Sequence, residues 1–210
     1  DDAALERVAD MLFSAVGSLT SPFNMSATLK SQAGLKTTDR TIKKYLDYFD
    51  ESFLFSKARR YDVRGRKYLY FPEKYYATDL GLRNARINFR QTEESHLMEN
   101  AIYNELIRRG YNVDVGVVEH FHKENGKTVR RQYEIDFVVN LGMEKVYVQS
   151  AFRIPDEAKR EQETKSLKWS GDFFRKIVVT SGSRRSLVDD DGIVHVGVIP
   201  FLLDPSILDG

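Results

Sequence analysis

The second half of the chain has a fixed order of helix and strand patterns, and this order limits the possible folds more than any other feature. Glu93 to Arg109 has the pattern of a helix, closed by Gly110, which readily adopts the left-handed conformation after a helix. A charged amphipathic helix follows at residues 156–169. Strand-like runs lie at residues 112–121, 128–140, 144–152 and 176–180, with a last strand and a short terminal helix within 192–204. Helix, three strands, helix and strand predict a mixed sheet flanked by helices, and therefore the α/β class.

The first third of the chain predicts three short helices. Over residues 3–16, apolar side chains recur at intervals of three and four, the period of one buried helical face. Ser26 can cap a second helix over residues 26–33, and Gly34 allows a left-handed turn after it. A third helix runs to about residue 49, with Thr37 or Thr38 as its cap.

Two aromatic-rich, strand-like runs follow these helices, one on each side of Arg64 and Gly65. Two capped helices joined by a tight turn, and then a basic hairpin, are the order of a winged-helix domain. Its long cationic side chains would neutralise DNA phosphates and contribute affinity that does not depend on base sequence. The candidate DNA-binding residues are Arg40, Lys43 and Lys44 on the third helix, and Arg59, Arg60, Arg64, Arg66 and Lys67 on the wing. The alternative is that these charges form an ordinary solvated face and that the module only packs against a neighbour.

A connector separates these two halves in the sequence. Residues 72–87 have no clear hydrophobic period and contain several turn residues, so they predict a boundary rather than a helix or strand. We therefore expect a helical winged-helix domain at residues 1–85 and a mixed-sheet α/β domain at residues 86–210.

Acidic and polar side chains in the second half fall where they could meet. Glu134 and Asp136 are two apart in a strand and share one of its faces, and Gln149 and Ala151 do the same in the next strand. If Glu99 approached from the preceding helix, it would meet Asp136 and Gln149 where a nuclease holds a divalent cation. Magnesium requires hard oxygen ligands, and a nearby lysine helps to stabilise the attacking water and the phosphate charge.

The arrangement of these segments resembles a known family. Helix, three strands, helix and strand are the element order of the PD-(D/E)XK nuclease fold, in which an acid and a lysine occupy the places of Gln149 and Ala151. More widely, the chain resembles bacterial and archaeal AAA-type ATPases whose C-terminal half joins a winged helix to a restriction-endonuclease-like domain. The segments that carry this resemblance are TIKKYLDYFDESFLFSKARRYDVRGRK (41–67), KYYATDLGLRNA (74–85), HLMENAIYNELIRRGYNVDVG (96–116), YEIDFVVN (133–140), VYVQSAF (146–152) and KIVVT (176–180).

The resemblance implies a larger protein with lost cleavage chemistry. An N-terminal P-loop ATPase domain, absent from this chain, would bind ATP and magnesium, and the fragment itself would need no cofactor. Glu99, Glu134, Asp136, Gln149 and Ala151 would be vestigial nuclease positions, because Ala151 stands where active relatives have lysine. Any metal that did bind would use Glu99 and Asp136.

We therefore expect a non-catalytic C-terminal region of an AAA-type ATPase that binds DNA or a protein partner for the ATPase domain. One alternative is a metal-dependent, structure-specific DNA nuclease. Another is a protein-binding regulatory module without DNA. Glu99 and Asp136 also have a purely structural interpretation, in which they anchor a loop or pair with Arg108, Arg130 or Arg131.

Composition excludes several other classes. The formal net charge of the 210 residues is only +1, so a nucleic-acid surface must be a local patch. The chain has no cysteine, which excludes disulfides and cysteine metal sites and fits a reducing cytoplasm. No apolar run reaches the roughly 18 residues of a membrane span, and no leader opens the chain, so we expect a cytoplasmic protein with no membrane contact. The acidic start without methionine suggests a fragment of a longer protein.

Three further motifs are weak. Gly126, Lys127 and Thr128 resemble the end of a P-loop, but the motif's earlier glycine is missing and strand residues follow, so a hairpin turn after Asn125 is the better interpretation. His120 and His122 share a strand face but lack further zinc ligands. The only tryptophan, at position 169, is expected to belong to the core.

Overall fold

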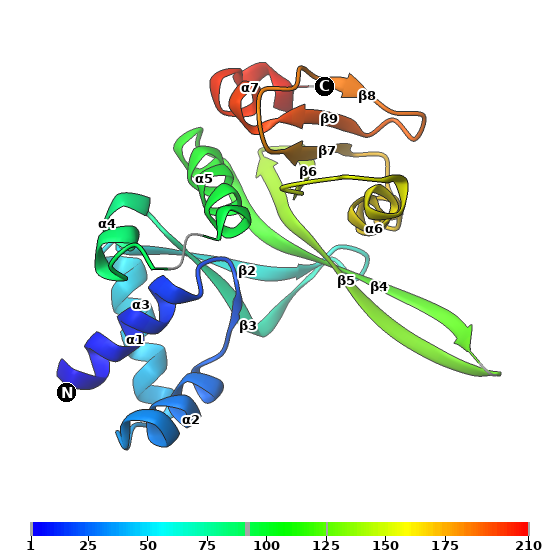
Figure 1. Ribbon diagram of the computed structural model, residues 1–210. Coiled ribbons are helices and arrows are strands. Elements are labelled where there is room, and N and C mark those ends of the chain that lie inside the picture. Colours follow the sequence, from blue (N-terminus) through cyan, green and yellow to red (C-terminus); the bar gives the residue numbers. More distant parts are fainter. Residues whose placement is uncertain (1, 91–92, 125, 210) are drawn as a thin grey trace. The chain divides into compact units, whose positions relative to one another are not determined.

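A computed structural model describes residues 2–90, 93–124 and 126–209 of the protein (Figure 1). The chain forms two compact units, which are described separately. Unit 1 consists of Asp1–Arg59 and Tyr70–Asn100, and unit 2 consists of Arg60–Leu69 and Ala101–Gly210. The predicted α/β class is confirmed, because helices accompany a mixed set of parallel and antiparallel strands.

Unit 1 begins with helices and ends with strands and further helical segments. Its elements are α1 (Asp2–Ser14), β1 (Leu19–Thr20), α2 (Pro22–Ala33), α3 (Asp39–Glu51), the first part of β2 (Phe55–Asp62), the second part of β3 (Lys67–Ala77), α4 (Leu80–Arg86) and the start of α5 (Glu94–Arg108). Strand β1 pairs antiparallel with β3, with Leu19 opposite Lys74. The helices pack around a buried cluster that includes Leu12, Ile42 and Phe55.

Local capping explains where these helices begin and end, and it corrects two predictions. Helix α2 starts at Pro22 and is capped by Ser21, not Ser26, because proline suits the first helical turn and the Ser21 hydroxyl accepts from the amide of Asn24. Gly34 is left-handed, with φ 65°, and Thr38 caps α3, as predicted. The segment expected to be a connector contains the end of β3 and the helix α4, because the Asp79 side chain caps that helix at the amide of Leu82.

Unit 2 contains the mixed sheet that the sequence predicts. Its elements are the end of α5 (Glu94–Arg108), β4 (Asn112–Glu124), β5 (Lys127–Leu141), β6 (Glu144–Ser150), α6 (Glu157–Lys168), β7 (Arg175–Thr180), β8 (Leu187–Val188), β9 (Val194–Gly197), α7 (Val198–Leu203) and the 3-10 helix η1 (Pro205–Leu208). The strand order in this unit is β2-β4-β5-β6-β7-β9-β8. Strands β4, β5 and β6 are antiparallel to one another, whereas β6, β7 and β9 are parallel.

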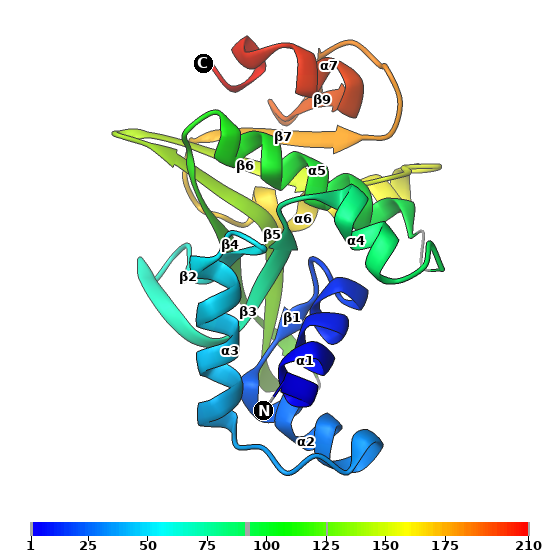
Figure 2. The same cartoon turned by 90° about the vertical axis from the view of Figure 1, so that its left-hand side faces the viewer.

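Helices cover the strands of unit 2. Leu167 of α6 packs in a buried cluster with Ile135, Tyr147 and Val178. The ring of Tyr103, near the end of α5, lies 6.1 Å from the ring of Phe137. In Figure 2, α5 passes in front of these strands and α6 lies behind them.

The β4–β5 hairpin extends well beyond the neighbouring strands (Figure 1). Its pairing runs from Asn112 opposite Asn140 to Glu124 opposite Lys127. Gly126 lies in the connecting turn with φ 76°, and strand β5 begins at the next residue, where a P-loop would need a helix. Asn125, the other residue of the predicted turn, lies outside the described residues.

The tip of the β2–β3 hairpin belongs to unit 2. Residues Arg60–Asp62 of β2 pair in parallel with residues Val115–Val117 of β4. The backbone amide of Val63 continues this contact by donating to the carbonyl oxygen of Val117, at 3.0 Å. The chain passes between the two compact units after residues 59, 69 and 100. The domain boundary that the sequence predicts between residues 85 and 86 stays a prediction.

Candidate nucleic-acid interface

Two of the predicted nuclease positions, Asp136 and Gln149, are neighbours on β5 and β6, and each binds the backbone of the other strand. The Asp136 carboxylate accepts a hydrogen bond from the amide of Ser150 at 2.8 Å. The Gln149 side-chain oxygen accepts one from the amide of Asp136 at 3.3 Å. Both side chains are buried, with 7% and 8% of their surface exposed. These bonds link β5 to β6 through the two side chains.

A β-bulge changes the direction of side chains at Asp136. The pairing of β4 with β5 shifts between Asp114 and Gly116, so that two residues of β5 lie opposite Val115. Alternation along β5 is broken there, and Ile135 and Val138 consequently pack in one cluster. The sequence prediction assumed an unbroken strand.

Ala151 is a packing residue. It is only 4% exposed and lies in the buried cluster with Tyr147 and Val178. Its amide donates to the carbonyl oxygen of Val179 at 2.8 Å, which continues the β6–β7 pairing past the end of β6. Glu134 is half-buried and lies opposite Val117 of β4.

Glu99 belongs to unit 1 and makes its polar contacts there. Its Oε1 atom accepts hydrogen bonds from Lys74 Nζ at 2.9 Å and from the Tyr76 hydroxyl at 2.8 Å. The Lys74 and Glu99 side chains are 5% and 13% exposed, so this is a largely buried ion pair. The structure therefore brings Asp136 and Gln149 together within unit 2, and it joins Glu99 to Lys74 within unit 1.

The arginines predicted as alternative partners of Glu99 and Asp136 contact other acidic residues. Arg108 binds Glu105 in the same helix, because the two residues are three apart and face each other. Arg130 binds Glu119 across the β4–β5 hairpin, and Arg131 Nη2 lies 3.7 Å from Glu124 Oε2. Within the described ranges 2–90, 93–124 and 126–209, no three acidic, histidine or cysteine side chains form a group that could hold a metal ion.

The cationic residues of α3 are exposed, but one of them is paired. Lys43 Nζ donates to Asp47 Oδ2 at 2.7 Å, and this hydrogen bond raises the pKa of Lys43. Arg40 and Lys44 are exposed on the same helix, and Arg59 is exposed on β2, also in unit 1.

The other predicted DNA-binding residues, Arg60, Arg64, Arg66 and Lys67, lie at the β2–β3 tip in unit 2. A buried aspartate shapes this turn. The Asp62 carboxylate accepts from the amide of Gly65 at 2.8 Å, and a Cβ on Gly65 would lie only 2.2 Å from Asp62 Oδ2. A side chain at position 65 would therefore push the Asp62 carboxylate away from its bond to this turn.

Of the predicted DNA-binding residues at the tip, Arg64 and Arg66 border a cavity of about 570 Å³, which we call the tip cavity, whereas Arg60 and Lys67 do not line it. Its lining residues are Val63, Arg64, Arg66, Lys145, Ser170, Gly171, Asp172 and Phe174. Lys145 Nζ lies 5.0 Å from the centre of the Phe174 ring and 5.5 Å from that of Tyr61, so cation–π contacts hold it at the cavity. Three cations and an aromatic ring thus meet at one concave surface.

The single acid of the tip cavity, Asp172, is already bound to other groups. Its carboxylate accepts from the Tyr147 hydroxyl at 2.6 Å and from the Ser170 hydroxyl at 3.2 Å. Burial raises the pKa of Tyr147, and the hydrogen bond to Asp172 adds to this effect. Sequence reasoning missed Lys145 and Phe174 because β6 and the α6–β7 connection meet the tip only in the folded chain.

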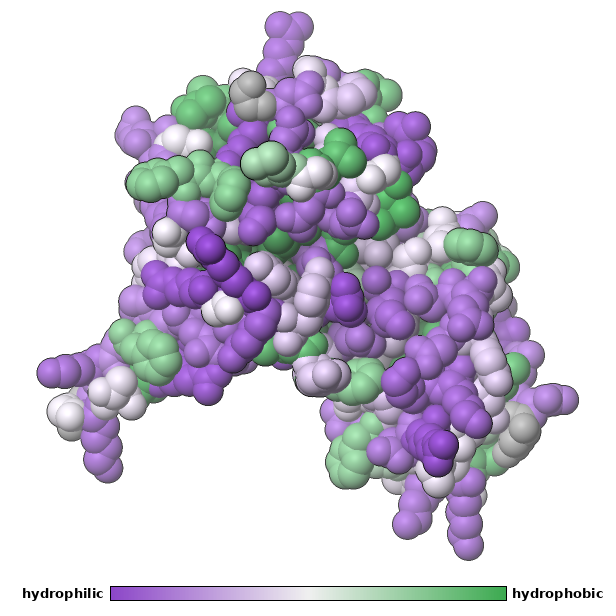
Figure 3. All heavy atoms as spheres, turned by 180° about the vertical axis from the view of Figure 1, so that it is seen from behind, coloured by the Kyte–Doolittle hydropathy of each residue, from purple (hydrophilic) through white to green (hydrophobic). Residues whose placement is uncertain are grey.

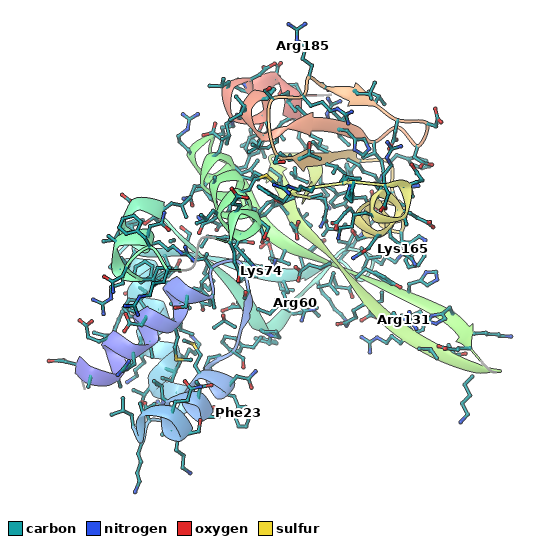
Figure 4. All side chains as sticks on the ribbon, in the orientation of Figure 1. Phe23, Arg60, Lys74, Arg131, Lys165 and Arg185 are labelled. Carbon is teal, nitrogen blue, oxygen red and sulfur yellow. The ribbon has the colours of Figure 1, made fainter. Side chains whose placement is uncertain are left out.

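A second group that sequence reasoning missed lies where the β4–β5 hairpin meets α6. Trp169 is half-buried and packs against the buried cluster of unit 2, and its ring stacks on that of His120 with centres 3.7 Å apart. Lys165 Nζ lies 4.8 Å from the Trp169 ring centre. Figure 4 shows Lys165 on α6 and Arg131 on the hairpin.

One face of the molecule is mainly polar. Hydrophilic side chains cover most of the face shown in Figure 3, with smaller hydrophobic areas between them. Among the helices of the described residues, none has the length and apolar composition that crossing a membrane demands. The predicted cytoplasmic location stays a prediction.

Comparison with known proteins supplies a domain family and two similar proteins. Residues 1–93 match the family described as Domain of unknown function (DUF8612). The chain is 37% identical over 203 residues to an uncharacterized protein of Haemophilus influenzae, a match that covers 97% of this chain and 46% of that protein. The chain thus spans slightly less than half of that relative's length. What a longer protein containing this chain does is therefore treated only as a proposal.

A solved structure also resembles the chain, more distantly. The crystal structure of protein VC1899 from Vibrio cholerae matches 99% of this chain and 55% of its own, with a TM-score of 0.35 and 14% sequence identity.

Proposed function

We propose that this chain is a DNA-binding region that does not cleave DNA. The observation that carries the proposal is the tip cavity, where Arg64, Arg66 and Lys145 surround a concave surface beside the Phe174 ring. Guanidinium and ammonium groups bind phosphodiester oxygens, and an aromatic face can stack on a base. Because the whole chain has a net charge of only +1, such a local group of cations is where affinity for DNA would reside.

The element order supports a DNA-binding role for the first part of the chain as well. Helix, short strand, two helices and two strands, with β1 paired to β3, are the arrangement expected of a winged helix. In that interpretation α3 is the recognition helix, and it presents Arg40 and Lys44.

The polar groups at the nuclease positions support binding without cleavage. Asp136 and Gln149 are bound to backbone amides, and Ala151 supplies no amine to stabilise a phosphate charge. The proposal therefore interprets unit 2 as a restriction-endonuclease-like fold, of the PD-(D/E)XK type, that has lost its chemistry.

The larger protein is proposed to be an AAA-type ATPase. This part rests on the sequence resemblance alone, and it predicts a P-loop and its acidic partner strand upstream of Asp1 in the gene. That domain, and not the present chain, would bind ATP and magnesium and would be a partner of this region.

The test of DNA binding is its dependence on salt. Affinity for a short duplex, measured from 50 to 200 mM salt, should fall linearly on logarithmic axes, because bound phosphates release counterions. The triple variant Arg64→Ala, Arg66→Ala, Lys145→Ala should lower the slope by about one for each phosphate that the protein no longer neutralises.

A matched triple variant, Lys123→Ala, Lys127→Ala, Arg131→Ala, removes three charges from the β4–β5 hairpin and should leave the slope nearly unchanged. Equal effects of the two triple variants would reject the tip cavity as the binding site. Binding that does not depend on salt would favour the protein-binding alternative.

The nuclease alternative has a separate test. Supercoiled plasmid incubated with the chain and magnesium or manganese should stay intact. Nicking or cleavage that disappears in Asp136→Ala would overturn the non-catalytic part of the proposal and leave DNA binding in place.

A further inference from the structure

A second cavity, of about 430 Å³, lies at the carboxyl ends of the parallel strands of unit 2. We call it the arginine cavity. Strands β6, β7 and β9 all end at this edge of the sheet, and Thr180 and Ser181 at the end of β7 are part of the lining. The crevice outside the carboxyl ends of parallel strands is the usual ligand position in open α/β sheets.

Three separate segments each contribute one arginine to this cavity. Arg153 follows β6, Arg160 lies in the first turn of α6, and Arg184 lies in the connection after β7. No aspartate or glutamate lines the cavity in the described part of the chain. Arg160 Nη1 is 3.3 Å from Glu157 Oε2, whereas among the described residues neither Arg153 nor Arg184 has a carboxylate partner.

The connection that carries Arg184 is fixed by its backbone. The carbonyl oxygen of Arg184 accepts from the amide of Gly197 at 2.8 Å, and that of Gly182 accepts from Ile199 at 3.0 Å. A Cβ on Gly197 would lie 2.5 Å from the amide nitrogen of Arg184. The backbone of the connection after β7 can therefore pack this closely against the end of β9 only because residue 197 is glycine. The amide of Ser181 donates to the carbonyl oxygen of Phe152 at 3.1 Å, which joins the connection to the segment after β6.

A histidine completes the lining and is held in place by its own partner. His195 lies on β9 with 7% of its surface exposed, and its Nε2 atom is 2.7 Å from Asp189 Oδ2. This contact fixes the orientation of the ring at the cavity wall.

From this geometry we propose that the arginine cavity binds a phosphate group, carried by a ligand of nucleotide size or by the end of a nucleic-acid strand. Planar guanidinium groups donate paired hydrogen bonds to phosphate oxygens, and hydroxyl groups such as that of Ser181 can donate a further one. The volume of about 430 Å³ is in the range of pockets that enclose small ligands. The site is separate from the tip cavity and does not depend on DNA binding there.

The test uses the full chain and titrates it with sodium pyrophosphate at constant ionic strength. A second arm compares a single-stranded oligonucleotide that carries a 5′-phosphate with the same oligonucleotide lacking it. Saturable binding of pyrophosphate supports a small phosphorylated ligand, and tighter binding of the phosphorylated oligonucleotide supports a strand end.

Arg184→Gln should weaken binding of the supporting probe by about tenfold or more, because it removes a charge-assisted hydrogen-bond donor. Only the backbone of Arg184 makes the contacts that fix the connection, so this variant should fold, and Arg153→Gln provides an independent second variant. The matched control is Arg185→Gln, because Arg185 is the next residue and points away from the body of unit 2 in Figure 4.

Two outcomes would overturn the proposal. One is the absence of saturable binding for both pyrophosphate and the 5′-phosphorylated oligonucleotide at millimolar concentration. The other is an equal loss of binding in Arg184→Gln and Arg185→Gln. Duplex binding through the tip cavity should persist in Arg184→Gln, and pyrophosphate binding should persist in the triple variant of Arg64, Arg66 and Lys145, so the two proposals can fail independently.

Discussion

At the residue scale, polar side chains in this protein are used to hold backbone segments together. Asp136 and Gln149 bind the amides of neighbouring strands, and Asp62 binds the turn at the β2–β3 tip. Buried polar groups are costly unless they are hydrogen-bonded, so each of these side chains has a structural reason to be where it is. A carboxylate at a nuclease-like position therefore does not by itself indicate catalysis.

Glu99 provides the first prediction at this scale. Glu99→Ala removes the carboxylate that both Lys74 and Tyr76 contact, and it should lower the free energy of unfolding by about 3 kcal/mol, the cost of breaking a largely buried pair. Glu99→Gln keeps an oxygen acceptor and should cost less. Chemical denaturation measures both, with Glu94→Ala at the exposed start of α5 as the control.

A control variant as unstable as Glu99→Ala would mean that the loss comes from helix α5 in general. An unchanged free energy of unfolding in Glu99→Ala would show that the pair with Lys74 is not a stabilising contact.

Asp189 provides a prediction about pH. Burial acts to raise the pKa of Asp189, but hydrogen bonds from His195 and from the amides of Ile193 and Asp191 outweigh it and leave the pKa below its ordinary value of 3.8. A carboxyl group with a lowered folded-state pKa stabilises the fold fully above its unfolded-state pKa, and this contribution is lost as the pH falls through the folded-state value. The free energy of unfolding of the wild type should therefore exceed that of Asp189→Asn by its largest amount near pH 5, within the acid range where Asp189 titrates.

This difference should shrink as the pH falls from about 5 through 3.8 and toward the lower folded-state pKa, and denaturation measured at intervals from pH 5 to pH 2 tests it. A difference that grows as the pH falls would contradict the sign of the lowered pKa.

At the element scale, backbone contacts made by glycine decide where two loops can lie. Gly197→Ala should place a methyl group against the Arg184 amide, so the connection after β7 must move. We expect a loss of about 1–3 kcal/mol in the free energy of unfolding and weaker pyrophosphate binding, because Arg184 moves with the connection. Gly81→Ala is the matched control, since its Cβ would meet only the Asp79 side chain, at 3.0 Å.

Thermal denaturation and pyrophosphate titration of both variants measure these effects. Wild-type stability and binding in Gly197→Ala would show that the connection does not need the close approach.

The elements themselves were largely predictable from the sequence, and the site was not. Periodicity and capping residues such as Thr38 located most helices and strands, because these signals act over a few neighbouring residues. Helix α4 was missed because it is one of the shortest helices and has no clear period. The bulge at Asp136 and the approach of Lys145 to the β2–β3 tip depend on pairing between distant segments, which local patterns do not record.

At the scale of the whole molecule, the course of the chain links the two compact units covalently in three places. Strands β2 and β3 and helix α5 each begin in one unit and end in the other. Residues 60–69 are therefore distant in sequence from the rest of unit 2, although Val63 belongs to its buried cluster and β2 pairs with β4 there.

This course of the chain predicts that a fragment cut at the proposed boundary is unstable. Residues 86–210 alone lack the segment Arg60–Asp62, so the edge of β4 is uncovered and the fragment also lacks the buried side chain of Val63. Removing one buried valine alone costs about 1.5–3 kcal/mol, and the bare strand edge favours association between fragments. We expect a lower denaturation midpoint than in the full chain, together with larger species in size-exclusion chromatography.

Adding the fragment 1–85 should reverse both effects, because it carries residues 60–69 and can restore the pairing with β4. A matched control adds the fragment 1–85 with Val63→Asp, in which a charge replaces the buried side chain and should prevent rescue. If the fragment 86–210 alone were monomeric and as stable as the full chain, the β2–β3 tip would contribute nothing to unit 2, and the tip cavity would lose its structural basis.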